Sequence, residues 1–249
     1  MFETALREWR NRRGMSQMAL AMAAEVSPRH LSFLESARAR PSAAMVLRLA
    51  EALDLPLRER NSLLVTAGFA PHYGDNDWLS PQMTELRQAA QLLLKAHGPY
   101  PALVLDAAFD ILEANGAALA LIGVAALPAV RLNLADLVFA PGAVSQAIVN
   151  WAEVAGYLMH RLREGVQRHG PDSPVTRVLM RVRRHEGVDD LSLRPEGTQG
   201  QVLLPLEFVM DGQVTRWFTT VTSFGAPQDA LAEEITIEQF HPNPQPAGD

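Results

Sequence analysis

The sequence of 249 residues contains no cysteine. This absence excludes disulfides, thiolate zinc sites, covalently attached haem of the CxxCH type and cysteine nucleophiles. No apolar run reaches the roughly 18–20 residues that a helix needs to span a bilayer. The N-terminal stretch MFETALREWRNRRGM also lacks the apolar core of about 7–15 residues that defines a secretory signal. We therefore expect a cytoplasmic protein.

Signatures of catalysis and metal binding are missing as well. The seven histidines are not placed at metal-ligand spacing, and the stretch HEGVDD at 185–190 lacks the second histidine of an HExxH motif. No GxSxG, GxGxxG or Walker pattern occurs. We therefore expect no catalytic residue, no metal and no cofactor, and a protein that is not an enzyme. A catalytic role for one part of the chain is kept as an alternative hypothesis.

Charge is unevenly distributed along the chain. The net charge is −6, but residues 1–73 hold ten arginines against seven acidic residues, a balance of about +3, which leaves about −9 for the remainder. Such asymmetry is typical of a nucleic-acid-binding module joined to a different one. The length also favours two domains. We expect residues 1–70 to form one domain, 71–80 a linker, 81–241 a second domain and 242–249 a disordered tail.

Short helices dominate the expected first domain. Apolar periodicity and capping residues predict helices over residues 2–13, 17–24, 28–36, 42–53 and 57–67. Ser16 and Ser27 suit the N-cap position, because their hydroxyls accept a hydrogen bond from a free backbone N–H. Pro28 suits the first helical turn, where its missing N–H costs nothing.

The expected second domain mixes helices and strands, so the fold class is α+β. Helices are predicted over 81–97, 116–123 and 173–185, and residues 143–170 form either one long helix or two helices broken near Gly156. Strands are predicted over 101–106, 109–115, 201–210, 213–224 and 234–240, where apolar residues alternate or β-branched residues accumulate. The Asp-Gly pair at 211–212 predicts a hairpin turn.

The stretch EVSPRHLSFLESARAR (25–40) carries the layout of a helix-turn-helix motif, whose second helix enters the DNA major groove. Leu31 and Leu34 face the core, as do Leu20 and Ala21 from the preceding helix. The side chains left facing outward form a candidate DNA-reading surface, and the arginines of the following loop suit phosphate contacts. These residues are Ser27, Pro28, Arg29, His30, Ser32, Phe33, Arg38 and Arg40.

Each of these candidates has an alternative interpretation. Arg29 binds a guanine edge with two hydrogen bonds, or contacts phosphate, or is merely solvated. Phe33 touches a thymine methyl or caps the following loop. His30, Arg38 and Arg40 reach phosphate or are solvated.

This region resembles the lambda-repressor-like helix-turn-helix domains of the xenobiotic-response-element (XRE) family. The matching residues are Gly14, Ser16, Gln17, Leu20, Ala21, Val26, Ser27, Leu31, Leu34, Glu35 and Pro41. The resemblance implies that Gln17 contacts DNA backbone or base, and that Arg10 and Glu35 form an ion pair. Ala37 stands where the family usually has glycine. Glycine accepts a left-handed conformation at low cost, so we expect reduced stability at this position.

A wider resemblance runs through nearly the whole chain. The segments at 34–73, 100–115 and 218–242, the last reading FTTVTSFGAPQDALAEEITIEQFHP, are similar to regulators with a C-terminal MmyB-like ligand-binding domain. The resemblance implies a PAS-like fold for residues 81–241, an antiparallel sheet with helices laid on it. It also implies a small apolar ligand of the fatty-acid kind.

The sequence is therefore interpreted as a sequence-specific, DNA-binding transcriptional regulator that binds double-stranded operator DNA as a homodimer, with no membrane partner. Aromatic side chains are the candidates for lining a ligand pocket, although aromatics at such spacings also serve as plain core. The candidates are Phe109, Trp151, Tyr157, Phe208, Trp217, Phe218 and Phe224. In the alternative hypothesis the C-terminal domain is a ligand-independent dimerisation or protein-docking module.

Overall fold

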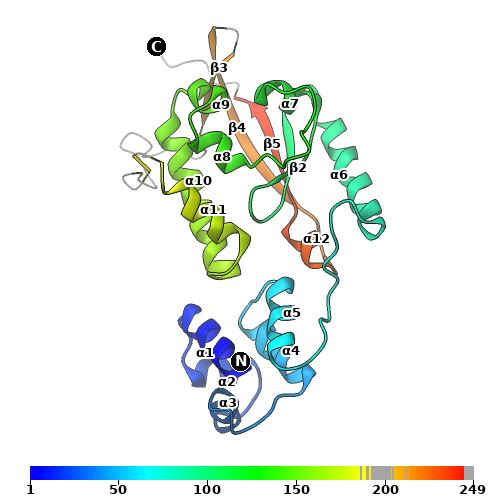
Figure 1. Cartoon of the computed structure of the whole chain (residues 1–249), viewed down its shortest axis with the longest axis vertical. Helices are drawn as coiled ribbons and strands as arrows, with labels where there is room; N and C mark the ends of the chain where they lie inside the picture. Colours follow the sequence, from blue (N-terminus) through cyan, green and yellow to red (C-terminus); the bar gives the residue numbers. More distant parts are fainter. Residues whose placement is uncertain (186, 189–190, 192–202, 204, 211, 244–249) are drawn as a thin grey trace. The chain divides into compact units, whose positions relative to one another are not determined.

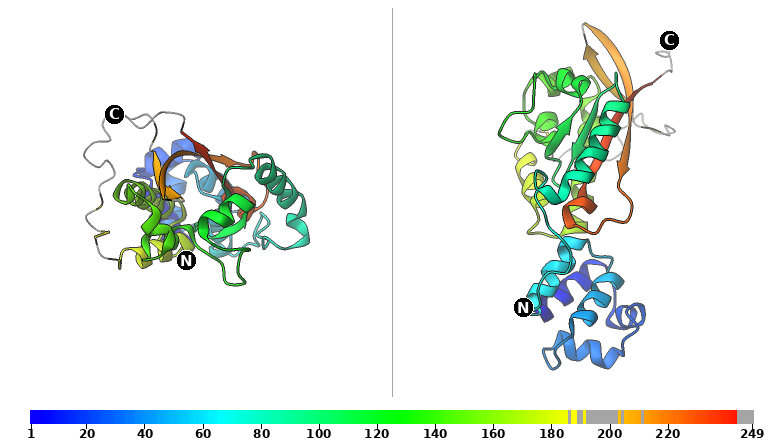
Figure 2. Two further views of the ribbon diagram at one scale, coloured as in Figure 1. Left: turned by 90° about the horizontal axis from the view of Figure 1, so that it is seen from above. Right: turned by 90° about the vertical axis from the view of Figure 1, so that its right-hand side faces the viewer.

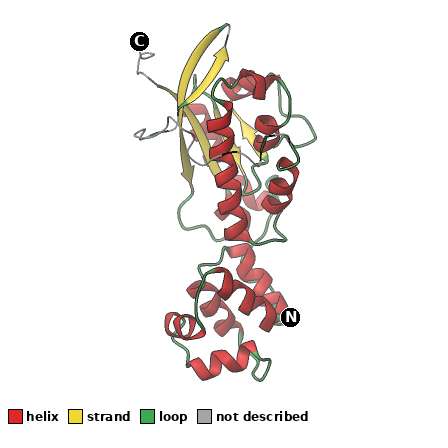
Figure 3. Ribbon diagram, turned by 90° about the vertical axis from the view of Figure 1, so that its left-hand side faces the viewer, coloured by secondary structure: helices red, strands yellow, loops and turns green. Residues whose placement is uncertain are grey.

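The computed structural model describes residues 1–185, 187–188, 191, 203, 205–210 and 212–243 (Figure 1). The chain divides into two compact units. The first unit is Met1–Asp77 with Gln167–His169 and Ala226–Glu233, and the second is Trp78–Val166 with Gly170–Gly225 and Glu234–Asp249. Strands are confined to the second unit, as Figure 3 shows by colour. The expected α+β class is confirmed.

Five helices make up residues 1–77. They are α1 (Phe2–Arg12), α2 (Gln17–Ala23), α3 (Pro28–Glu35), α4 (Ala43–Ala52) and α5 (Leu57–Thr66). Ser16, Ser27 and Ser42 cap three of them, each accepting a hydrogen bond from the backbone N–H three residues later. The helix N-caps predicted at Ser16 and Ser27 are confirmed. Fully buried leucines from all five helices form one core, which fixes the helices against one another.

The segment after α5 is held to that helix through one buried amide. The Asn61 side chain accepts hydrogen bonds from the backbone N–H groups of His72 and Tyr73, and donates one to the Tyr73 carbonyl. The start of the expected linker therefore has defined contacts. Beyond it come η1 (Pro81–Met83) and α6 (Thr84–Ala96), so the helix predicted over 81–97 begins with a single tighter turn.

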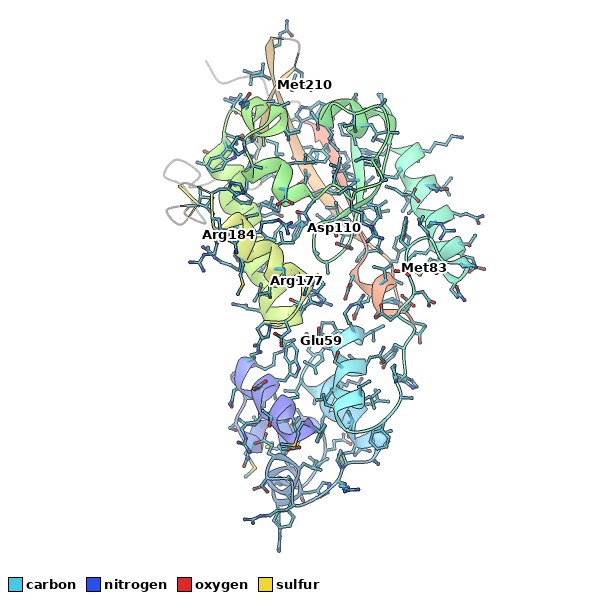
Figure 4. All side chains as sticks on the ribbon, in the orientation of Figure 1. Glu59, Met83, Asp110, Arg177, Arg184 and Met210 are labelled. Atoms are coloured by element: carbon cyan, nitrogen blue, oxygen red, sulfur yellow. The ribbon has the colours of Figure 1, made fainter. Side chains whose placement is uncertain are left out.

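The second unit is built on a five-stranded antiparallel sheet in the order β2-β1-β5-β4-β3 (Figure 1). The strands are β1 (Ala102–Leu105), β2 (Ile111–Ala114), β3 (Leu206–Met210), β4 (Gln213–Ser223) and β5 (Thr236–Pro242). Met210, labelled in Figure 4, stands at the tip of the β3–β4 hairpin, as the Asp-Gly pair predicted. An antiparallel sheet with helices laid on it is the PAS-like arrangement expected.

Six further helices follow α6 along the described chain, the last of which, α12, lies almost wholly within the first unit. They are α7 (Gly116–Ile122), α8 (Leu134–Phe139), α9 (Ala143–Ala147), α10 (Trp151–His169), α11 (Pro174–Val182) and α12 (Ala230–Glu234). Figure 2 shows α6 running beside the sheet, and α6 contacts β1.

Two predictions of element boundaries were wrong. The helical stretch 143–170 breaks at Ile148–Asn150 and not near Gly156, because this short link pairs with β3: the N–H of Val149 donates to the Glu207 carbonyl, and Asn150 bonds to Pro205 and Glu207. The last strand begins at Thr236, because α12 occupies the residues before it.

The ends of two other predicted segments lie partly beyond the described residues. Pro242 continues β5, so the expected tail starts inside the sheet, while residues 244–249 are outside the described part. The first residues of the strand predicted over 201–210 are likewise outside it, apart from Leu203 and Pro205.

Candidate nucleic-acid interface and ligand pocket

The helix α3 has one buried and one open face. Leu31, Leu34 and Glu35 are buried, whereas Ser27, Pro28 and Arg29 are exposed and the remaining outward residues are half-buried. The capping serine and the proline fix where the helix begins, so its first turn is presented with a defined backbone. The structure therefore brings the predicted reading residues His30, Ser32 and Phe33 together with those three on one helix.

Arg29 and Phe33 form a pair on this open face. The Arg29 guanidinium lies over the Phe33 ring, 5.4 Å from its centroid, one helical turn away. The Phe33 carbonyl accepts hydrogen bonds from the N–H groups of Arg38 and Ala39, which tie the following loop to the end of α3. Phe33 thus supports the loop through its backbone while its side chain remains half-exposed beside Arg29.

A buried carboxylate holds α3 to α1. Glu35 is 1% exposed, and its two oxygens accept hydrogen bonds from Arg10 at 2.6 and 3.0 Å. Gln17, at the start of α2, donates a third at 2.8 Å, and Arg7 lies nearby and donates to the Glu35 carbonyl. The predicted Arg10–Glu35 ion pair is confirmed.

Electrostatics follow from this geometry. Burial raises the pKa of the Glu35 carboxyl, but the hydrogen bonds from Arg10 and Gln17 and the charges of Arg10 and Arg7 outweigh it, so the net pKa lies below its ordinary value. The same hydrogen bond raises the pKa of Arg10 against the opposing effect of burial. Gln17, the residue expected to contact DNA, is exposed and is oriented by the same carboxylate.

The loop from α3 to α4 carries the two arginines expected to meet phosphate. Arg38 and Arg40 are both exposed. Ala37 before them has a φ of 58°, in the left-handed region that glycine adopts most easily. The sequence therefore places a strained alanine where the loop turns, as the comparison with glycine suggested.

The second unit contains a largely aliphatic pocket of about 730 Å³, a volume that includes its open mouth. It lies between one face of the sheet and helices α7–α10. Its lining residues are Leu103, Ala118, Leu121, Ile122, Leu134, Leu137, Val138, Val144, Ile148, Val154, Tyr157, Leu158, Arg161, Leu206, Phe208, Thr219, Glu238 and Phe240.

An ion pair interrupts the apolar lining. Arg161 of α10 donates a hydrogen bond to Glu238 of β5 at 2.7 Å, and both side chains are largely buried, at 15% and 7% exposed. The Arg161 guanidinium also lies 4.9 Å from the centroid of the Phe109 ring and 5.8 Å from that of Tyr157. The pocket therefore has a polar group at a fixed place in an otherwise apolar wall.

Of the aromatic residues expected to line a pocket, Tyr157 and Phe208 do so. Phe109 is buried beneath Arg161 and supports the pocket without lining it. Trp151 donates its indole N–H to the Val138 carbonyl at 2.7 Å, behind the lining.

The other three aromatic candidates lie on or beside β4, outside the lining. Trp217 packs edge-on against Tyr100, and Phe218 stacks on His241. Phe218 precedes Thr219, which lines the pocket, so its side chain is on the opposite face of the sheet. Phe224 follows the end of the strand and is half-buried.

The sequence analysis missed Arg161 and Glu238. A signal was present for Arg161, which follows Val154, Tyr157 and Leu158 on the apolar stripe of α10. Glu238 had no such signal, because the alternation of Ile235 and Ile237 assigns it to the other face of β5, which is also buried in the structure.

The basic run RVRR at 181–184 is partly neutralised within its own unit. Arg181 forms two hydrogen bonds of 2.8 Å with the Asp136 carboxylate of α8. Within the described residues no group of three or more potential metal-ligating side chains comes together, and no helix has both the length and the apolar character needed to cross a membrane.

A helix-turn-helix unit with an open α3, joined to a sheet domain with an apolar pocket, defines a DNA-binding regulator with a ligand-binding domain. Family comparisons agree. Residues 4–63 match a helix-turn-helix domain, and residues 86–248 match the MmyB-like transcription regulator ligand binding domain. The second match covers more than half of the chain, so the protein belongs to the family of MmyB-like transcription regulators. A search of curated proteins found no match.

Proposed function

We propose that the protein is a sequence-specific transcriptional regulator whose residues 1–70 read operator DNA and whose residues 81–241 sense a small apolar ligand. The observation that carries the first half is the open face of α3, which is held by the buried Arg10–Glu35–Gln17 network. Arg29 would read a base edge, Phe33 a thymine methyl, and the loop arginines phosphate.

Arg29 is tested by substitution with alanine. Losing a two-point interaction with a guanine edge should cost roughly 1–3 kcal/mol and relax selection at one position of the operator. The measurement is selection of bound sequences from a random library, followed by titration of the best site. Arg48→Ala is the matched control: it removes the same charge from an exposed position on α4 that has no partner among the described residues. Equal weakening on all sequences would make Arg29 a phosphate-binding residue.

A homodimer is proposed because helix-turn-helix proteins usually read two half-sites about one DNA turn apart. If about six phosphates are neutralised per dimer, log affinity should fall with log salt at a slope near −5. Replacing Arg38 and Arg40 with alanine should bring the slope closer to zero by about one unit for each phosphate that is no longer neutralised, without changing the selected sequence. A salt-independent affinity would contradict the DNA half of the proposal.

The ligand half is carried by the aliphatic pocket. An apolar cavity lined by leucine, isoleucine and valine binds flexible hydrocarbon well, and only a ligand with different affinity for two states of the protein can shift DNA binding. Comparison of native with denaturing mass spectrometry of the purified full-length chain tests retention of such a molecule. Released mass matching a lipid supports the sensor. Protein that stays without added mass after exposure to lipid extract supports the docking module instead.

A filling substitution tests whether the pocket itself is the site. Ala118→Phe places a ring among the lining residues from α7, whereas Ala120→Phe places it at an exposed position two residues away. Only the first should abolish ligand retention. Loss with both, or with neither, would show that the ligand sits elsewhere.

A further inference from the structure

The polar side chains of the pocket are gathered at one place. Thr219 and Glu238 are diagonal neighbours on one face of the sheet, because Thr219 pairs with Phe240 and Glu238 with Val221. Glu238 meets Arg161, whose guanidinium lies beside the Tyr157 ring. The remaining lining side chains are hydrocarbon. The pocket is therefore divided into a polar end and an apolar remainder, the form expected for an amphiphile.

The polar end has unused hydrogen-bonding capacity. A guanidinium carries five N–H donors, and Arg161 uses one of them on Glu238; no other acceptor for it occurs within the described residues. The second carboxylate oxygen of Glu238 likewise receives no hydrogen bond from the described part of the chain. These free groups are within reach of water, because within the described residues the buried side-chain atoms that lack a partner are Trp78 Nε1 and Ser80 Oγ. A ligand that enters the polar end must therefore replace their hydration with hydrogen bonds of its own.

Charge decides which head group fits. Arg161 and Glu238 neutralise each other, and Arg161 is the sole cation among the described lining residues. An anionic head would add an uncompensated negative charge beside Glu238 in a largely apolar cavity. A neutral head that both accepts from Arg161 and donates to Glu238 adds two hydrogen bonds without that charge.

We propose that the pocket selects an amphiphile with a hydrocarbon tail and a neutral head group that both donates and accepts hydrogen bonds, such as an alcohol, an amide or a protonated carboxylic acid. The proposal rests on the pocket being the ligand site, as proposed above. Arg161 and Glu238 would read the head group, and Phe109 would position Arg161 from beneath.

A series of matched probes tests it on the full-length, delipidated protein. Dodecanol, dodecanamide, dodecanoate and dodecane are compared by displacement of the neutral fluorophore N-phenylnaphthylamine. At neutral pH the alcohol and the amide should bind about tenfold more tightly than dodecanoate. The free energy of one hydrogen bond, or of placing one more negative charge beside Glu238, corresponds to an affinity ratio of about ten. Dodecanoate binding as tightly as dodecanol, or more tightly, would overturn the proposal.

Substitution of Glu238 should reverse the preference. Glu238→Gln leaves Arg161 without its counter-charge, so dodecanoate should gain about tenfold in affinity. The control is Glu207→Gln, which removes a carboxylate from another ion pair of the same sheet. Glu207 lies 2.8 Å from Arg216, outside the pocket lining, so this variant should leave the affinities for all four probes unchanged. An unchanged ratio in Glu238→Gln refutes head-group reading.

A further test uses the wild-type protein and therefore does not depend on whether Glu238→Gln folds. Only the protonated acid is expected to bind well, so apparent affinity for dodecanoic acid should rise as pH falls toward the acid's own pKa, while affinity for dodecanol stays constant. A parallel response of both probes would overturn the proposal. Equal binding of all four probes refutes it while keeping the apolar pocket; displacement by none refutes the pocket as the ligand site.

Discussion

Replacing Glu35 with glutamine tests whether the network under α3 stabilises the DNA-binding unit. The carboxylate is 1% exposed and receives three side-chain hydrogen bonds, two of them from Arg10. Glutamine keeps the shape but removes the charge, which leaves the guanidinium of Arg10, itself 12% exposed, without a counter-charge. Only its hydrogen bond to the Met15 carbonyl then remains unaffected.

The magnitude follows from those interactions. Removing one partner of a buried, hydrogen-bonded ion pair costs about 3–5 kcal/mol, and the amide can still accept one bond, so we expect a loss of about 2–3 kcal/mol. Domains of this size are stable by only about 5–15 kcal/mol. The first unit should therefore open far more often, at α1 and α3 together, since the network joins these two helices.

Hydrogen–deuterium exchange read by mass spectrometry localises the effect. Peptides from α1 to α3 should exchange roughly 30- to 150-fold faster in Glu35→Gln, the ratio that corresponds to this free energy. Glu8→Gln, at an exposed position on α1, is the control and should leave exchange unchanged. Peptides from the sheet of the second unit should not change in either variant.

The pH dependence adds an independent check. The pKa of Glu35 is lowered from its ordinary value of 4.5, so its contribution is fully present above that value and is lost as pH falls through the lower pKa of the folded state. The difference in stability between wild type and Glu35→Gln should therefore become smaller in acid. A stability difference that is absent at neutral pH, or constant down to strongly acidic pH, would refute this account of the network.

Three further outcomes are expected. Ala37→Gly should stabilise the first unit by about 1 kcal/mol, because φ is 58° there, and slower exchange in α3 and α4 is the measurement. Asn133→Ala should destabilise the second unit by about 2–3 kcal/mol in chemical unfolding, because this buried amide bonds to Ala108, Asp110 and the first turn of α8. Burial raises the pKa of Asp106 to about 6, so the folded state binds the extra proton and stability should rise as pH falls from about 6 toward 3.8; Asp106→Asn should remove that slope, and a slope that persists contradicts the assignment.

The first unit was predictable because its signals are local. Ser16, Ser27 and Pro28 fix helix starts within a few residues of themselves, and the leucine stripes identify the buried faces without knowledge of the partner. The Arg10–Glu35 pair was inferred from resemblance, because nothing in the local pattern joins residues 25 positions apart.

The second unit was less predictable because distant interactions override local preference. Gly156 was the expected break in the helical stretch, yet it lies inside α10, and the chain breaks where Val149 and Asn150 pair with β3 about 55 residues later. The helix α8 follows Asn133, whose side chain caps its first turn and also bonds to the β1–β2 turn, where Asp110 is labelled in Figure 4. The cap is a local signal, whereas the bond to Asp110 and the break at 148–150 depend on distant partners.

Aromatic residue type was a poor guide to the residues that line the pocket. Aromatic rings have few rotamers and fixed shapes, and here Phe109 and Trp151 act as rigid supports behind the wall, one under Arg161 and one against the Val138 carbonyl. The wall itself is leucine, isoleucine and valine, which conform to a flexible tail. A charged residue on an apolar stripe needs a partner of opposite sign. Arg161 could have been identified in this way, whereas its partner Glu238 lies 77 residues further along the chain and is placed by the pairing of β5 with β1 and β4.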